Sequence, residues 1–207
     1  MRITPVLLAT AAALAFMTVS ANAGTVTFEG SVANGSLVFV PPAYSESGFT
    51  LSYTATDGGS NDKAAIFGAS TAGGLIGDST ANLVWNGSEG SHVTLTSPGS
   101  FDLFSVDLGG YGQAINQQHT DITLTGYLTA GGSETVTFSN LLSITTENIG
   151  WTGLDHVDFF GTNYGGMDNL VVSSAAGSAT PEPGTVLLLG AGSAALALIR
   201  RRQSLGN

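Results

Sequence analysis

The chain has 207 residues, of which 10% are charged and 29 are glycine, and it contains no cysteine. This composition excludes a coiled coil, a collagen and a charge-rich disordered chain. The lack of cysteine excludes disulfides, thiolate zinc sites, cysteine nucleophiles and a cysteine-linked lipid anchor. The formal net charge of −10 excludes nucleic acid as a partner, because that partner needs clustered Lys and Arg.

Residues 1–23 have the order of parts found in a secretory signal peptide. Arg2 supplies the positive start, residues 6–19 are largely apolar, and Ala21-Asn22-Ala23 fits the small-residue cleavage site. We therefore expect export through the Sec translocon and cleavage by signal peptidase, so that the mature chain begins at Gly24. A retained N-terminal anchor and a short buried helix are the alternatives.

Residues 24–173 alternate apolar and threonine-rich positions, which is typical of half-buried strands. The apolar members of these runs are Val26 and Phe28, Val93 and Leu95, Phe104, Val106 and Leu108, Ile122 and Leu124, Val136 and Phe138, and Leu170 and Val172. About ten short strands are expected, and this spacing predicts an all-β ectodomain, an antiparallel β-sandwich. No 20–50-residue repeat suggests a solenoid.

Turn residues divide these runs. Ala130-Gly131-Gly132-Ser133 predicts a hairpin between residues 121–129 and 134–140. Breaks are also expected at Pro41-Pro42, at Ser97-Pro98-Gly99 and at Gly109-Gly110. The Gly-rich stretch 56–81 shows little pattern, so it is expected to be a long loop that either carries function or is mobile.

The segments 101–109 and 167–172, FDLFSVDLG and MDNLVV, resemble jelly-roll domains of the carbohydrate-binding or galactose-binding-like type. The resemblance implies a jelly-roll-like sandwich in which the closing strand lies beside the N-terminal region that holds Glu29. It also implies a structural calcium ion between Glu29 and Asp168, together with backbone carbonyl groups. Two ordinary surface carboxylates are the alternative.

Aromatic residues are the candidates for stacking on sugar rings. Trp85, Trp151 and Tyr164 are favoured, with Tyr111 and Tyr127 beside them, and packing in the core is the alternative. Asp155 and Asp158 flank His156, and strand geometry would point His156 and Asp158 to one side as a conceivable metal pair. A surface hydrogen-bonding histidine is the simpler interpretation.

No nucleophile elbow, phosphate-binding loop or zinc-helix motif occurs, so the sequence predicts no catalytic residue and no enzyme. Two carboxylates brought together from distant strands could still hydrolyse glycosides. Between residues 24 and 180 the one basic residue is Lys63, against 14 carboxylates, which gives this part a formal charge of −13. Such a surface favours solubility outside the cell.

The C-terminus combines a predicted flexible linker, residues 174–180, with a three-part signal over residues 181–203 and a tail, residues 204–207. The signal consists of Pro181-Glu182-Pro183, an uncharged run at 185–199, and Arg200-Arg201-Arg202. As a helix the run would span about 22 Å, which permits a short transmembrane helix with the arginines in the cytoplasm. A permanent anchor and a buried helix are the alternatives.

This segment resembles the PEP-CTERM sorting signal. The resemblance implies an exosortase in a Gram-negative bacterium, transient anchoring in the inner membrane, and delivery to the cell surface or extracellular matrix alongside exopolysaccharide. The sequence thus predicts a non-enzymatic, exosortase-processed surface or matrix protein associated with exopolysaccharide. A carbohydrate-binding module with a defined glycan ligand is the alternative, followed by a secreted glycoside hydrolase.

Overall fold

The computed structural model describes residues 23–40, 43–56, 63–69, 74–113 and 116–174. The predicted N-terminal signal helix and C-terminal transmembrane helix lie outside these residues, and so do nearly all of the linker and all of the sorting signal.

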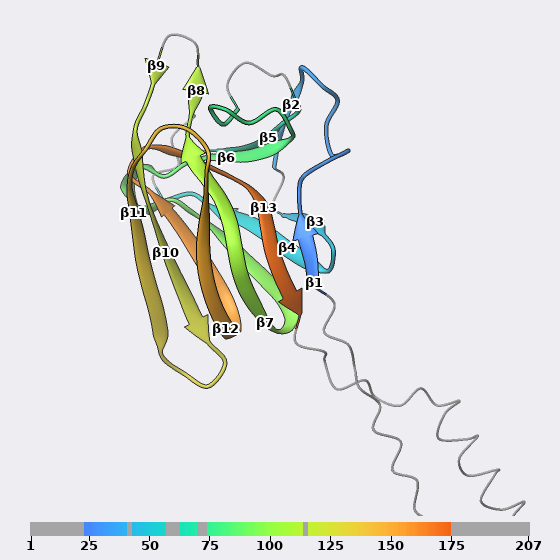
Figure 1. Cartoon of the computed structure of the whole chain (residues 1–207), viewed down its shortest axis with the longest axis vertical. Coiled ribbons are helices and arrows are strands. Elements are labelled where there is room, and N and C mark those ends of the chain that lie inside the picture. Colours follow the sequence, from blue (N-terminus) through green and yellow to red (C-terminus); the bar gives the residue numbers. More distant parts are fainter. Residues whose placement is uncertain (1–22, 41–42, 57–62, 70–73, 114–115, 175–207) are drawn as a thin grey trace, which may run out of the picture. The chain divides into compact units, whose positions relative to one another are not determined.

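The described part of the chain is all-β, as the alternation predicts (Figure 1). Apart from a single 3-10 turn, η1 (Ser88–Gly90), its regular elements are strands. They are β1 (Ala23–Val26), β2 (Leu37–Phe39), β3 (Tyr44–Glu46), β4 (Phe49–Thr54), β5 (Ala64–Phe67), β6 (Asn82–Asn86), β7 (His92–Gly110), β8 (Gly112–Gln113), β9 (Asn116–Gln117), β10 (Thr120–Leu128), β11 (Ser133–Leu141), β12 (Thr145–Gly161) and β13 (Tyr164–Ser174).

Eleven of the strands form one antiparallel sheet that curls around the core (Figure 1). The order is β11-β10-β12-β7-β13-β6-β5-β2, with β1 beside β13, β4 beside β7, and β3 beside β4. Strand β7 makes the curl continuous, because its first half pairs with β4 and its second half pairs with β13. The two sides of the predicted sandwich are therefore joined through long strands.

The strands are longer than the sequence predicted, and fewer breaks interrupt them. Strand β7 has 19 residues and continues through Ser97-Pro98-Gly99, where a break was expected. The pairing with β12 shifts between the pairs Thr96↔His156 and Phe101↔Leu154. Pro98 and Gly99 are exposed in this irregularity, where a residue without a ladder N–H is tolerated.

A second irregularity in β7 reverses one predicted face. Phe104 was expected to share a face with Val106 and Leu108, but Phe104 is 41% exposed while Leu103, Val106 and Leu108 are fully buried. On β13, adjacent Val171 and Val172 face Ser105 and Leu103, so that Phe104 is the extra residue. A bulge of this kind shifts the alternation by one position.

Strand β5 lies inside the stretch 56–81, which was expected to be a loop. All four of its residues are buried, because Ala64 and Ile66 face the main core while Ala65 and Phe67 pack in a second, smaller apolar cluster. A strand buried on both faces lacks the alternation that identifies a half-buried strand.

The predicted hairpin is confirmed as β10 and β11, which pair antiparallel from Thr120↔Leu141 to Tyr127↔Ser133. At its turn the N–H of Gly131 donates to the carbonyl of Leu128 over 2.9 Å, and the N–H of Leu128 donates to the carbonyl of Gly132 over 3.1 Å. Gly131 and Gly132 both have positive φ angles, 89° and 92°, which glycine adopts without steric cost.

One core contact of the hairpin depends on a missing side chain. A Cβ atom on Gly126 of β10 would lie 2.6 Å from Cε3 of Trp151 and 2.8 Å from Cδ2 of Leu154, both on β12. The indole therefore packs directly against the backbone of β10.

Replacing Gly126 with Ala should overpack this contact and lower the free energy of unfolding by about 1–3 kcal/mol. Urea unfolding followed by tryptophan fluorescence measures the change. Gly99→Ala is the matched control, since a Cβ there would meet no atom within 4 Å and should have little effect. Equal stability of the two variants would contradict the packing described.

Candidate functional site

A pocket of about 260 Å³ opens beside the edge of the sheet formed by β2, β5 and β6. We call it the tyrosine pocket. The described residues that line it are Leu37, Phe39, Lys63, Ala65, Phe67, Val84, Tyr111 and Tyr164. Its floor is the small second core, because Ala65, Phe67 and Val84 of that cluster also line the pocket. The volume is slightly below the roughly 300–1,000 Å³ of sites for drug-sized ligands.

Aromatic rings from distant parts of the chain form the wall of this pocket. The ring centroids of Tyr111 and Tyr164 lie 5.2 Å apart at an interplanar angle of 34°, and those of Phe67 and Tyr111 lie 6.2 Å apart at 67°. Pairing of Gly110 with Gly165, one residue from each tyrosine, brings the two phenol rings together. Burial, and to a lesser extent the neighbouring Tyr164, raises the pKa of Tyr111, which keeps its hydroxyl a neutral hydrogen-bond donor.

Of the three aromatic residues favoured for stacking on sugar, the structure places one at the tyrosine pocket. Tyr164 is half-buried and lines it. Trp85 has no exposed surface, and Trp151 is 9% exposed and packs against Gly126. Both tryptophans belong to the main core, so their ring faces are occupied by protein. Tyr127, on β10, stacks on His156 at a centroid distance of 4.2 Å, away from the pocket lining.

A second candidate site gathers the acidic residues for which calcium was predicted. We call Glu29, Asp78, Thr80 and Asp168 the acidic cluster. The Thr80 hydroxyl contacts Oδ2 of Asp168 at 2.9 Å, and the N–H of the next residue, Ala81, donates to Oε1 of Glu29 at 2.8 Å. The structure therefore brings Glu29 and Asp168 to neighbouring positions of one segment, and it adds Asp78.

Glu46 fixes the chain just before Glu29. Its Oε2 accepts hydrogen bonds from the backbone N–H of Phe28 at 3.0 Å and from the hydroxyl of Tyr44 at 2.8 Å. Phe28 is fully buried with a φ angle of 59°, so the chain turns sharply there. This turn directs Glu29 toward the segment that precedes β6.

Too few protons are available for the hydrogen bonds of the acidic cluster. The single Thr80 hydroxyl proton cannot serve both Oδ2 of Asp168 and Oδ1 of Asp78, although the hydroxyl oxygen lies within hydrogen-bonding distance of both. In addition, Oδ1 of Asp168 and Oδ2 of Asp78 are buried without a hydrogen-bond partner among the described residues. A buried carboxylate oxygen of this kind needs a proton, a cation or a water molecule as its partner.

The electrostatics of Asp168 are consistent with that requirement. Burial raises its pKa from the usual 3.8 to about 7, and the nearby Asp78 and Asp107 add to the rise. Hydrogen bonds from the Asn169 backbone and from Thr80 oppose it. Calcium would satisfy the two free oxygens, but it takes six to eight oxygen ligands. The described residues contain no group of three acidic, His or Cys side chains placed to hold a metal, so backbone carbonyls or water would have to complete the shell.

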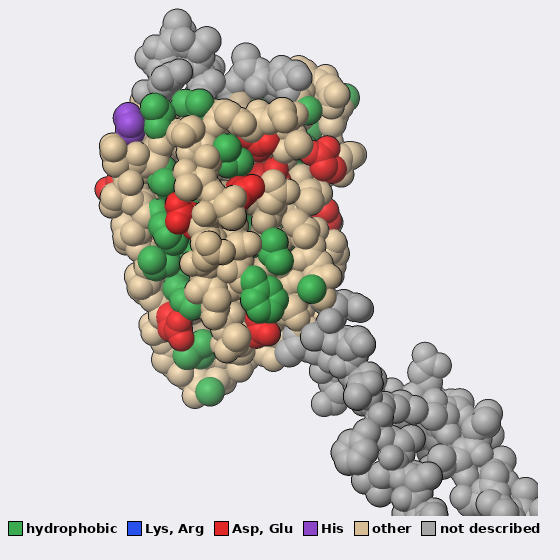
Figure 2. Space-filling model, viewed as in Figure 1, with side chains coloured by type: hydrophobic (Ala, Val, Ile, Leu, Met, Phe, Trp, Pro, Cys, Tyr) green, Lys and Arg blue, Asp and Glu red, His purple; other side chains and the backbone are tan. Residues whose placement is uncertain are grey.

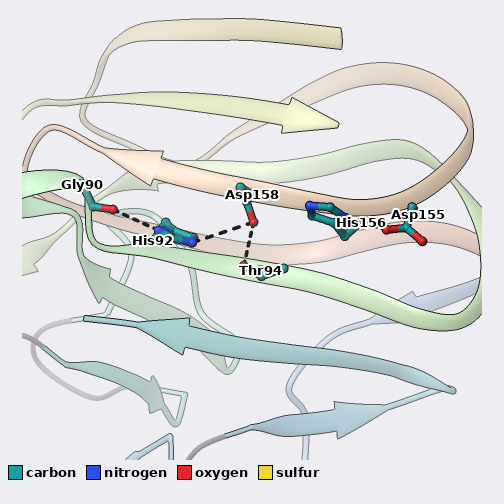
Figure 3. Close-up of polar contacts among 6 residues, drawn as sticks. All are labelled: Gly90, His92, Thr94, Asp155, His156 and Asp158. Atoms are coloured by element: carbon teal, nitrogen blue, oxygen red, sulfur yellow. Dashed lines mark hydrogen bonds and ion pairs between the residues drawn. The ribbon is translucent and has the colours of Figure 1, made fainter. Parts of the chain in front are cut away.

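The histidine–aspartate pair predicted on β12 is arranged differently (Figure 3). Nδ1 of His156 contacts Oδ2 of Asp155 at 2.8 Å, whereas Asp158 contacts residues of β7. The Thr94 hydroxyl donates to Oδ1 of Asp158 at 2.6 Å, and Nε2 of His92 lies 4.0 Å from the same oxygen.

This set does not form a nucleophile relay. Thr94 donates its proton to the carboxylate, and Nδ1 of His92 lies 3.0 Å from the carbonyl oxygen of Gly90 (Figure 3). A relay needs the imidazole within hydrogen-bonding reach of the hydroxyl that it activates.

The residues of the predicted sorting signal lie outside the described part, and they were compared with known families by sequence. Residues 179–202 match the family model described as the PEP-CTERM protein-sorting motif. The chain carries a PEP-CTERM sorting motif. The match includes Pro181-Glu182-Pro183 and the Arg200-Arg201-Arg202 cluster. The motif marks an exported protein that passes through a membrane-anchored stage and has an exosortase as its processing partner.

No curated protein matches the chain. One solved structure, the crystal structure of the enzymatically active domain of bacteriophage CBA120 tailspike protein 4 (TSP4dN, orf213), is similar at 13% sequence identity and a TM-score of 0.32. That match covers 62% of this chain and 19% of the tailspike chain, and it is too low to bear on fold or function.

In the described residues, helices with the length and apolar character to cross a membrane are absent. The apolar run at 185–199 of the PEP-CTERM motif lies outside the described residues. Ala23 and Gly24, at the predicted cleavage point, lie in β1 and pair with Ser173 and Val172 of β13. Ala21 falls outside the described part.

Sequence reasoning missed most of the tyrosine pocket and half of the acidic cluster. Lys63 and Phe67 of the tyrosine pocket and Asp78 and Thr80 of the acidic cluster all come from the stretch 56–81, which was assigned to a loop. Two signals were available. Lys63 is the one basic residue of the domain, and Asp78-Ser79-Thr80 has the spacing of an Asx-turn, which places the Asp carboxylate against the third residue.

In EDTA, the free energy of unfolding of the wild type relative to that of Asp168→Asn should fall as the pH rises from about 4 to about 7. The folded state binds the Asp168 proton more tightly than the unfolded state does, since its pKa is raised to about 7 from 3.8. That stabilisation is complete below the unfolded pKa and disappears as the pH passes the folded pKa. Adding calcium at the higher pH should restore the melting temperature of the wild type alone.

Glu134→Gln is the matched control. Glu134 is exposed on β11, so its replacement should leave both the pH profile and the calcium response unchanged. A wild-type melting temperature that is the same in EDTA and in calcium would contradict calcium binding at the acidic cluster. A stability difference between the wild type and Asp168→Asn that does not change with pH would contradict the raised pKa of Asp168.

Proposed function

We propose that the chain is a non-enzymatic protein of the cell surface or extracellular matrix that an exosortase processes and that associates with exopolysaccharide. The observation that carries this proposal is the PEP-CTERM motif at residues 179–202 of a chain whose first 23 residues have signal-peptide features. The domain between them has a formal charge of −13 over residues 24–180, which favours solubility. On the face drawn in Figure 2 the charged side chains visible are carboxylates spread among uncharged ones, apart from a histidine.

Replacing Glu182 with Ala should leave the protein uncut and held in the membrane fraction, because the protease can no longer recognise its motif. Mass spectrometry of the wild type from the native organism should find a chain that begins at Gly24 and lacks the arginine cluster. Glu147→Ala, in β12 of the domain, is the matched control and should be processed normally. Normal release of the Glu182 variant would contradict exosortase processing.

The tyrosine pocket favours a sharper second candidate, a carbohydrate-binding module. Phenol rings suit the apolar faces of pyranose rings, and their hydroxyls together with the Lys63 ammonium are donors for sugar hydroxyls. Among the described residues that line the pocket there is no Asp or Glu. Because glycoside hydrolysis uses a pair of carboxylates, this lining favours binding over the hydrolase alternative.

Replacing Tyr164 with Leu should abolish glycan binding by the mature protein, since the apolar bulk remains but the aromatic face and the hydroxyl are lost. Binding is measured on a glycan array and then by calorimetry with the best ligand. Tyr127→Leu is the matched control, because Tyr127 stacks on His156 outside the pocket. Loss of binding in the Tyr127 variant alone would move the glycan site to the outer face of β10 and β12. Equal binding by both variants would contradict a role of the tyrosine pocket in glycan binding.

A further inference from the structure

The tyrosine pocket holds the one basic side chain of an acidic domain. Lys63 is the single cation between residues 24 and 180, where 14 carboxylates are present. Within the part of the chain that the structure describes, no acidic residue lines the pocket and no carboxylate forms an ion pair with Lys63. The position of this charge is therefore a specific feature of the pocket.

Contact with an aromatic ring positions the ammonium group. Nζ of Lys63 lies 4.8 Å from the ring centroid of Phe39, within the range of a cation–π interaction. Phe39 is itself 55% exposed on β2, a strand at the end of the sheet order. The ammonium is thus held at the rim of an apolar pocket, where a bound anion would be partly shielded from water and its attraction strengthened.

We propose that the tyrosine pocket binds a sugar residue that carries a carboxylate, such as a uronic acid. The carboxylate accepts charge-assisted hydrogen bonds from the Lys63 ammonium, while the sugar ring packs against the phenol rings of Tyr111 and Tyr164. This inference rests on the proposed binding of glycan at the pocket, and it defines the chemical class of the ligand.

The charge of the rest of the domain restricts that ligand further. With a formal charge of −13 over residues 24–180, the surface repels a polymer that carries a charge on every residue. This repulsion extends over about 10 Å at 0.1 M salt, which is longer than one sugar unit but shorter than an extended oligosaccharide. The pocket therefore selects an isolated acidic sugar, at a chain end or as a branch, in a glycan that is otherwise neutral.

A matched set of ligands tests the carboxylate. The mature wild-type protein is titrated with methyl glucuronoside, with its uncharged methyl ester and with methyl glucoside, and binding is followed by saturation-transfer NMR and calorimetry. We expect the acid to bind about tenfold more tightly than the ester, the size of effect typical of a charge-assisted hydrogen bond. Lys63→Gln should bring the acid to the affinity of the ester, whereas Lys63→Arg should keep most of the preference.

The outcomes separate this inference from the function on which it rests. Equal binding of acid and ester by the wild type, or an unchanged preference in Lys63→Gln, would overturn the role of the carboxylate while leaving glycan binding at the pocket intact. Binding of none of the three ligands, nor of any array glycan, would overturn both. A polyuronate that binds more tightly than the single acid at low salt would overturn the restriction to isolated charges. Because Lys63 is an exposed side chain, its replacement should leave the fold intact. Thermal melting of each variant checks that it does.

Discussion

The antiparallel pairing of β13 with three other strands is the constraint on which both candidate sites depend. Strand β13 bonds to β1, β6 and β7, and it brings the first described strand beside the last. Its beginning presents Tyr164 to the tyrosine pocket, and its middle buries Asp168 in the acidic cluster. Since the chain has no cysteine, hydrogen bonding and the apolar core alone hold this arrangement. The placement of both sites is therefore a direct result of how the sheet closes.

Charge is distributed in two opposite ways in this domain. One carboxylate, Asp168, is fully buried, and its environment raises the cost of ionising it. The one basic residue, Lys63, lies instead at an exposed rim against Phe39. The first feature is suited to holding a proton or a cation within the fold, and the second to meeting an anion from outside. Solubility alone would require neither position, because surface carboxylates already provide it.

Strands that bury one face were predicted correctly from the sequence, whereas a strand that buries both faces was not. The hairpin of β10 and β11 could be predicted, because one face of each strand is polar and its turn contains Gly131 and Gly132. Strand β5 could not, since it is buried on both sides and reads as a short apolar run. The exposure of Phe104 depends on a bulge, which shifts the alternation without leaving a mark in the local sequence.

The sequence by itself determined the export features, the PEP-CTERM motif, the acidic charge and the all-β class. These properties depend on the local order of residues and on strand periodicity, which can be read along the chain. Only the tertiary structure decided that Tyr111 lies against Tyr164, that Asp78 and Asp168 share one hydroxyl, and that Trp85 is buried. Each of these facts depends on the register between strands far apart in sequence, and composition and local pattern do not encode that register.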